Sequence, residues 1–205
     1  MEKKKSSNAS AEKLTGKKTF DAIVVGASAG GLEALGRLLS EFDERFPASL
    51  IIVQHLYPGS PNMVASILNN KCTLFVKEAD EKEEIKPSTV YLAPANYHLL
   101  VESDRTLSFS VDEKVNYSRP SIDVLFQSAA DVYKSALIGI LLTGANSDGA
   151  RGMQYIKENG GTTIAQDPKT AEVPLMPQAA IDLAAADYIL PLPKIYHKVK
   201  DLVDG

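Results

Sequence analysis

The chain has 205 residues, of which 44% are hydrophobic and 23% are charged, and its formal net charge is −4. This is the composition of an ordinary soluble domain that can bury a substantial core, and no apolar run approaches the roughly 20 residues of a transmembrane helix. The single cysteine, Cys72, excludes an internal disulfide and a cysteine-based zinc site, so we expect a cytoplasmic protein.

Charge is distributed unevenly along the chain. Residues 1–18 hold six lysines and two glutamates, whereas the remainder holds 16 basic and 24 acidic residues and has a net charge of −8. We interpret residues 1–18 as a disordered polar leader, without the features of a signal peptide, and residues 19–205 as one domain. The acidic body argues against nucleic acid as a partner.

The first predicted elements are a strand, a glycine-rich turn and a helix. Ala22–Val25 is a short apolar run typical of a buried central strand, and it breaks into Gly26-Ala-Ser28-Ala-Gly30-Gly31. Leucines then recur at helical spacing. This order places Ser28 at the carboxyl edge of a sheet, where open α/β proteins build their sites.

Three interpretations of this turn remain open. The Gly-x-Ser-x-Gly pattern around Ser28 fits a nucleophile elbow, in which small neighbours leave a serine hydroxyl exposed. The same turn is also an imperfect dinucleotide fingerprint, or a tight turn without chemistry. A dinucleotide site needs an acidic residue at the end of the second strand, where this chain has Gln54-His55, which argues against a nucleotide.

Strands and helices alternate along the rest of the chain. Further strands are predicted at residues 50–55, from 75, and at 89–93, 97–102, 106–111, 137–142, 162–165 and 188–190. Helices are predicted from Ser60-Pro61, after Arg119-Pro120-Ser121, through Met153–Lys157, from Pro177 to Ala184 and over 194–203. The pattern predicts a three-layer, Rossmann-like, doubly wound α/β fold, with a mostly parallel sheet, helices on both faces and an antiparallel hairpin.

Three reactive side chains follow predicted strands: Ser28, His55 and Asp148. If these strands are neighbours, the side chains converge. An imidazole can then take the serine proton, and a carboxylate can orient the imidazole. Taken alone, His55 fits a structural histidine and Asp148 fits a helix start, so the conjunction carries the hypothesis. His98 and His197 are weaker candidates.

These residues lie in blocks that resemble the catalytic domain of the CheB-type protein-glutamate methylesterases of bacterial chemotaxis. The resemblance covers roughly residues 20–195. The matching blocks are Gly26–Gly31, Gln54-His55, Val90–Pro94, Arg119–Phe126, Leu142–Gly144 with Asp148–Ala150, and Met176-Pro177. The family's catalytic serine, histidine and aspartate fall on Ser28, His55 and Asp148.

The resemblance implies hydrolysis of γ-glutamyl methyl esters on the cytoplasmic helices of chemoreceptors, with release of methanol, and deamidation of some receptor glutamines. It implies no metal and no organic cofactor. Backbone N–H groups of Ala29 and of the loop at Gly144 and Ala145 are expected to stabilise the oxyanion. Arg119 is a candidate for substrate positioning, with a structural role beside Pro120 as the alternative.

The sequence departs from the family pattern in two ways. Family members commonly have methionine where Ala145 stands, so we expect a wider and less apolar pocket. Only about 18 residues precede the first strand, too few for the receiver domain of the best-known members, so phosphorylation in cis is not expected to control activity. Two alternatives stay open: an esterase with another substrate in a non-chemotactic signalling system, and a non-catalytic regulatory binding module. The oligomeric state is not predicted.

Overall fold

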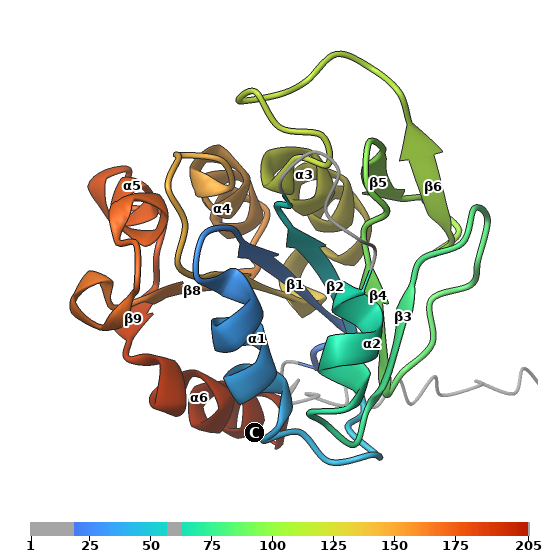
Figure 1. Ribbon diagram of the computed structural model, residues 1–205, viewed down its shortest axis with the longest axis horizontal. Helices are drawn as coiled ribbons and strands as arrows, with labels where there is room; N and C mark the ends of the chain where they lie inside the picture. Colours follow the sequence, from blue (N-terminus) through green and yellow to red (C-terminus); the bar gives the residue numbers. More distant parts are fainter. Residues whose placement is uncertain (1–18, 57–62, 205) are drawn as a thin grey trace, which may run out of the picture.

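The computed structural model describes residues 19–56 and 63–204, and it confirms the predicted doubly wound α/β architecture (Figure 1). Seven parallel strands form the central sheet in the order β3-β4-β2-β1-β7-β8-β9. Their bounds are Ala22–Ala27 (β1), Ser49–Gln54 (β2), Phe75–Glu78 (β3), Thr89–Leu92 (β4), Leu137–Leu141 (β7), Thr162–Gln166 (β8) and Tyr188–Leu190 (β9).

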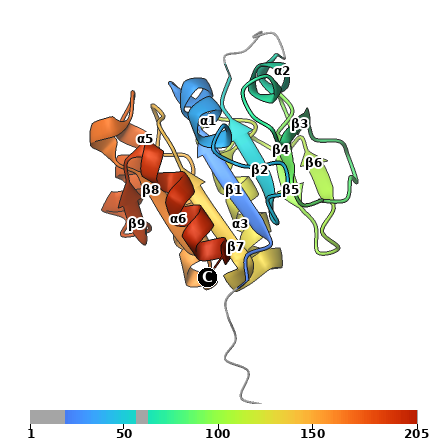
Figure 2. The same cartoon turned by 90° about the horizontal axis from the view of Figure 1, so that it is seen from below.

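Both faces of the sheet are covered, which explains the continuous apolar runs of its central strands. Alternate residues of β1 enter different cores: Ile23 and Val25 pack on one face, and Ala22 and Val24 on the other. The first face carries α1 (Gly31–Leu39), α2 (Val64–Asn69) and α6 (Leu192–Asp204). The second carries α3 (Ile122–Tyr133), α4 (Ala150–Glu158) and α5 (Leu175–Asp182). Figure 1 shows these two layers above and below the sheet, and Figure 2 shows α1 and α6 in front of it.

The strand order creates a switch point beside β1. The chain moves outward from β1 through β2, and later returns to place β7 on the other side of β1. The loops that follow β1, β2 and β7 therefore open at the same carboxyl edge, where connections diverge to opposite faces and leave a crevice. These are the loops that carry Ser28, His55 and Asp148.

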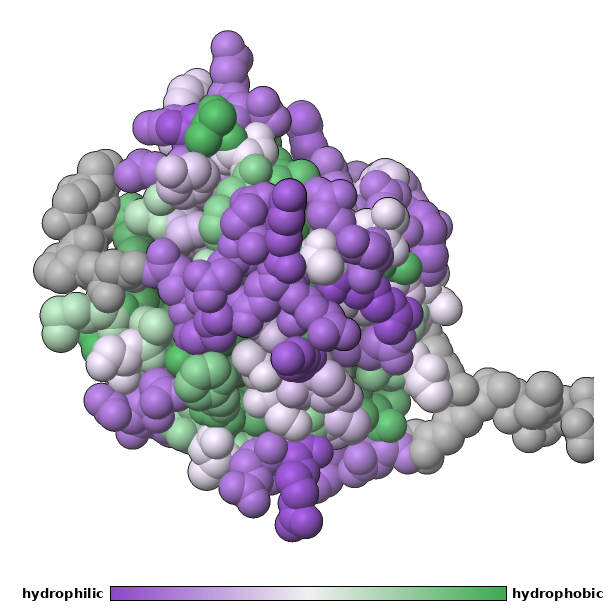
Figure 3. Space-filling model, turned by 90° about the vertical axis from the view of Figure 1, so that its right-hand side faces the viewer, coloured by the Kyte–Doolittle hydropathy of each residue, from purple (hydrophilic) through white to green (hydrophobic). Residues whose placement is uncertain are grey.

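A separate antiparallel hairpin, β5 (His98–Val101) with β6 (Leu107–Ser110), is present as the sequence predicts, and it packs beside α3 on the second face of the sheet. The side of the molecule near β3 and β6 is largely hydrophilic (Figure 3). There Lys77 pairs with Asp80 at 2.7 Å and with Glu83 at 2.8 Å, so the charged run after Phe75 forms surface ion pairs.

Several element boundaries differ from the sequence predictions. Helix α5 begins at Leu175, two residues before the predicted start at Pro177, and α6 begins at Leu192, two residues before the predicted start at residue 194. The segment 167–174 contains a short 3₁₀ turn at Pro168–Thr170, where the sequence pattern predicts no helix or strand. The predicted helix start at Ser60-Pro61 lies outside the described residues. The longest described helix, α6, has 13 residues, and no described helix is long and apolar enough to cross a membrane.

Candidate active site

Ser28 is the first residue after β1, and the backbone of its turn is anchored on both sides. Its N–H donates to the Thr143 carbonyl at 3.0 Å, which extends the β1–β7 ladder by one step. Its carbonyl accepts the Gly31 N–H at 2.8 Å and the Gln54 side-chain amide at 2.9 Å. Gly30 has φ 76° in the left-handed region, where glycine is favoured, so the turn can enter α1 directly behind the serine.

His55 and Asp148 form the predicted pair. The His55 backbone N–H donates to the Ala27 carbonyl at 2.9 Å, so the residue continues β2 beside the end of β1. Its imidazole Nε2 lies 3.0 Å from Asp148 Oδ2, with side-chain exposures of 11% and 0%. Because Nε2 faces the carboxylate, Nδ1 is the ring nitrogen left to accept a proton.

Asp148 is buried, and several protein groups donate hydrogen bonds to its carboxylate. Oδ1 accepts from the Asn116 amide at 3.0 Å and the Ser121 hydroxyl at 2.8 Å, and Oδ2 accepts the Ile122 N–H at 2.7 Å. Burial alone would raise the pKa of Asp148, but hydrogen bonds from His55, Asn116 and the Ile122 N–H outweigh it and lower the pKa. The carboxylate is therefore ionised at neutral pH.

Asp148 caps a helix, but a different one from the helix that its position in the sequence suggests. The sequence places it just before α4, as a residue favoured at that helix start. In the structure its carboxylate instead accepts the Ile122 and Asp123 N–H groups, at 2.7 and 3.2 Å, and so caps α3. The positive end of the α3 dipole adds to the stabilisation of the charge.

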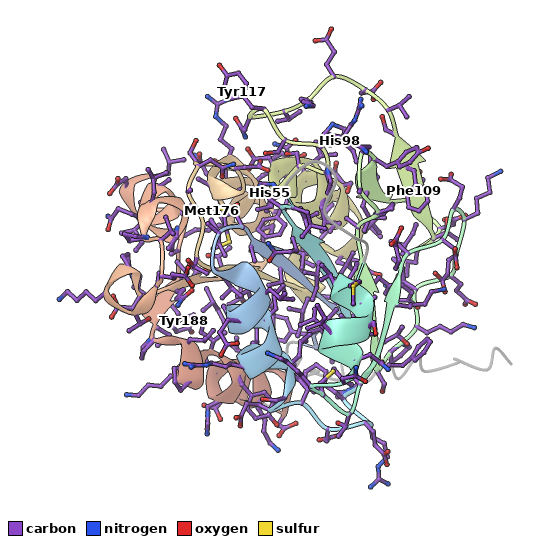
Figure 4. The ribbon with its side chains drawn as sticks, viewed as in Figure 1. His55, His98, Phe109, Tyr117, Met176 and Tyr188 are labelled. Carbon is purple, nitrogen blue, oxygen red and sulfur yellow. The ribbon has the colours of Figure 1, made fainter. Side chains whose placement is uncertain are left out.

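A cavity of about 650 Å³ opens at this edge of the sheet. It is lined by Ser28, His55, Gln54, Ala145, Asn146, residues 29–33 and 56, and Lys71. Figure 4 shows His55 and Met176 at this end of the molecule. Ser28 and His55 thus share one solvent-accessible space. Among the described residues no hydrogen bond joins the Ser28 hydroxyl to the ring, a contact that often tightens only when substrate binds.

The candidate oxyanion donors separate into two groups. The Gly144 N–H donates to the Val173 carbonyl at 3.0 Å, so in this conformation it is not available to a substrate. Within residues 19–56 and 63–204, the N–H groups of Ala29 and Ala145 have no backbone acceptor. Both residues line the cavity, which leaves them as the candidate donors.

The side chain of Arg119 lies outside the cavity lining. Its Nη1 donates to the carbonyls of Val111 and Asp112, at 2.7 and 3.0 Å, so the guanidinium holds the loop before α3. These two contacts are structural, and a contact of Arg119 with substrate stays a prediction. His98 is buried, with Nδ1 accepting the Ser121 N–H at 3.2 Å, and His197 is exposed.

Sequence reasoning missed a layer of neutral polar residues beneath the site. The Thr143 hydroxyl lies 2.9 Å from the Ala29 carbonyl, and Gln54 donates to the carbonyls of Ser28 and His55 at 2.9 and 2.8 Å. Asn116 contacts both Asp123 and Asp148. Thr143 and Gln54 lie within the quoted blocks, but Asn116 lies in a polar loop without any distinguishing pattern.

The fold and this edge together define an α/β protein that presents a serine, an imidazole and a buried carboxylate at the switch point of a parallel sheet. The CheB methylesterase family model matches residues 23–199. A Leptospira interrogans protein, named as a putative protein-glutamate methylesterase/protein-glutamine glutaminase, is 53% identical over 176 residues, or 86% of this chain and 91% of that protein.

A Thermotoga maritima protein-glutamate methylesterase/protein-glutamine glutaminase is 40% identical over 88% of this chain, which spans 54% of that relative's length. The crystal structure of the Thermotoga maritima CheB methylesterase catalytic domain superposes with a TM-score of 0.86 at 37% identity, covering 90% of this chain and all of that domain. The chain belongs to the CheB methylesterase family.

Proposed function

We propose that this chain is a protein-glutamate methylesterase that hydrolyses γ-glutamyl methyl esters in the cytoplasmic helices of chemoreceptors, and that it also deamidates receptor glutamines. The observation that carries the proposal is the 3.0 Å contact between His55 Nε2 and the buried Asp148 carboxylate, in a cavity that Ser28 shares. A carboxylate that orients an imidazole beside a serine is the arrangement that activates the hydroxyl. The names of the Leptospira and Thermotoga relatives support the same reaction.

In the first half of the reaction, Ser28 Oγ attacks the ester carbonyl carbon, and its proton passes to His55 Nδ1. Asp148 stabilises the imidazolium that forms. The carbonyl oxygen becomes an oxyanion, which the N–H groups of Ala29 and Ala145 can bind. Collapse of this intermediate breaks the bond to the methoxy group, which takes the proton from His55 and leaves as methanol.

In the second half, water hydrolyses the γ-glutamyl ester on Ser28. His55 accepts a proton from the water as it attacks, and returns it to Ser28 Oγ when the acyl bond breaks. The product is a free glutamate side chain. When the substrate is a glutamine, the same steps release ammonia instead of methanol.

The cavity rim suits a charged protein surface. Glu33 and Lys71 both line it and pair at 3.3 Å, and both are largely exposed. Hydrogen bonds from Arg37 and Lys71 lower the pKa of Glu33, so the rim carries both signs of charge at neutral pH. A receptor helix that presents a methylated glutamate among other polar side chains would meet matching polar groups.

The test is methanol release from methylated chemoreceptor membranes. The wild type should release methanol, and Ser28→Ala should abolish release while its circular dichroism spectrum stays unchanged. Retained release by Ser28→Ala would reject Ser28 as the nucleophile.

Labelling with a fluorophosphonate distinguishes the alternatives. A wild type that is labelled at Ser28 but releases no methanol is an esterase for another substrate. A folded wild type that is not labelled is a binding module.

A further inference from the structure

Asn116 occupies an unusual position between two buried carboxylates. Its side-chain Nδ2 donates to Asp123 Oδ2 at 2.8 Å and to Asp148 Oδ1 at 3.0 Å, so each amide hydrogen has one acceptor. Asp123 and Asp148 are 3% and 0% exposed. Two ionised carboxylates that lie this close together in a buried site repel each other, and the amide that donates to both of them offsets part of this repulsion.

Asp123 is the second acceptor of the Asn116 amide, and it is itself held in place by α4. Its Oδ1 accepts the Gly152 N–H at 2.6 Å, which ties it to the start of α4. Burial raises the pKa of Asp123, the Gly152 hydrogen bond lowers it, and the Asp148 charge raises it further; the net shift is upward. Asp123 is not among the residues that line the cavity, and its contacts toward the site are with Asn116 and Asp148.

Asn116 belongs to the largely exposed loop 111–121, which joins β6 to α3 and arches outward beside α3 (Figure 1). Two consecutive residues, Asn116 at φ 50° and Tyr117 at φ 62°, have left-handed backbone. This conformation turns the Asn116 amide inward while Tyr117, 97% exposed, points outward from the molecule (Figure 4). The guanidinium of Arg119 holds the first residues of the same loop.

We propose that Asn116 is a positioning residue for the reaction, whose amide, anchored by Asp123, holds the Asp148 carboxylate in the orientation that His55 requires. This inference rests on the proposed function, because it needs Asp148 to act on His55. It extends the catalytic machinery from the strand ends to the loop before α3.

The test compares two substitutions at position 116 with a matched control. Asn116→Gly removes the amide but tolerates the left-handed backbone, and Asn116→Asp keeps the shape but replaces the donor with a third carboxylate. Asn96→Gly is the control, because Asn96 has φ 66° and lies exposed in the turn before β5. Circular dichroism confirms that each variant is folded.

The readout is the rate at which a fluorophosphonate labels Ser28, measured against pH. A hydrogen bond to a charged group is worth about 1.5–3 kcal/mol, so Asn116→Gly should slow labelling about tenfold or more near neutral pH. The titratable groups around Asp148 are His55 from the end of β2, Asp123 from α3, and His98 behind Ser121. The Asn116 hydrogen bond helps to lower the pKa of Asp148, so its loss should raise the pKa of that carboxyl, and the acidic limb of the profile should move to higher pH. Asn116→Asp should move it further.

A second readout does not depend on turnover. The imidazole N–H proton of His55 that faces Asp148 should give a downfield resonance in the wild type and in Asn96→Gly, and this signal should shift or broaden in Asn116→Gly. Wild-type rates, an unmoved acidic limb and an unchanged resonance in Asn116→Gly would overturn the inference. If the wild type is labelled but releases no methanol from receptors, the proposed substrate fails while this comparison still decides the role of Asn116. If the wild type is not labelled, both fail.

Discussion

Replacing Thr143 with valine tests whether the layer beneath the active site positions the nucleophile. Valine has nearly the same shape as threonine but no hydroxyl. Thr143 is 1% exposed, and its Oγ1 donates to the Ala29 carbonyl at 2.9 Å while accepting the Val173 N–H at 2.9 Å. The substitution therefore removes one hydrogen bond from the residue that follows Ser28 and one from the loop before α5.

The expected magnitude follows from the two groups that lose a partner. A buried donor or acceptor left unsatisfied costs about 1–3 kcal/mol, and the new methyl group offsets part of this, so we expect a loss of about 2–4 kcal/mol in the free energy of unfolding. For a chain of this size that is a fall in Tm of roughly 4–16 °C. Loosening the Ala29 carbonyl also displaces a candidate oxyanion donor. Complete loss of such a donor costs about 10²–10³-fold in rate, so a displaced one should cost about tenfold.

The chain offers a matched control in Thr163→Val. Thr163 is fully buried, its Oγ1 donates to the Ala185 carbonyl at 2.7 Å and accepts the Asp187 N–H at 3.0 Å, and it lies on β8 away from the cavity. The assay is the Ser28 labelling rate well below each variant's Tm. Both variants should lose similar stability, and only Thr143→Val should label more slowly. Equal labelling rates in the two variants would refute the positioning role of Thr143.

Three further predictions follow from the site. Asp148→Asn should lower kcat by about 10⁴-fold, as the same change does in serine-protease triads. If the amide oxygen stays toward His55 and the Ile122 N–H, the amide NH2 group faces the Asn116 amide and the Asp123 N–H, which are also donors, so the side chain cannot hold the orientation of the carboxylate; a loss below tenfold would contradict its role. The pKa of Asp148 is lowered from 3.8, so its ionised carboxylate contributes in full to the free energy of unfolding above about pH 4. That contribution is lost as the pH falls through the folded-state pKa. Urea titrations should therefore show the free energies of unfolding of the wild type and Asp148→Asn converging as the pH falls. Ala145→Met should lower KM for the methyl ester about 2- to 10-fold with little change in kcat, since it adds apolar surface to the cavity; an unchanged KM would place the residue outside the substrate contact.

The parts of the fold that the sequence predicts well are those whose signal is local. Ile23–Val25 and Leu137–Leu141 are apolar at every position, and this occurs where helices cover both faces of a parallel strand. Boundaries set by tertiary contacts are less visible. Helix α5 begins at Leu175 rather than Pro177, and the Met176 N–H in its first turn donates to the Gly144 carbonyl at 3.0 Å, a partner 32 positions earlier in the chain.

The candidate site shows the same division. Ser28, His55 and Asp148 each follow an apolar strand, so the order of strands and loops is enough to suggest that they meet. The Gly144 N–H illustrates the limit: its acceptor, the Val173 carbonyl, belongs to a segment with no regular periodicity, so nothing in the sequence removes Gly144 from the oxyanion candidates. Arg119 is a similar case, because its partners are backbone carbonyls, which carry no sequence signal.

The surroundings of Asp148 join its catalytic and structural roles. Donors to its carboxylate come from the end of β2, from the loop 111–121 and from the first turn of α3, so the ionised state depends on how these elements pack against the β7–α4 loop. The same hydrogen bonds cap α3 and hold it at the sheet edge. Substitution by alanine would therefore remove a helix cap, leave buried donors unsatisfied and abolish the imidazole partner at once. Changes that keep the Asp148 side chain in place, such as Asp148→Asn or the removal of a single donor at Asn116, can separate the charge that serves His55 from the hydrogen bonds that serve the fold.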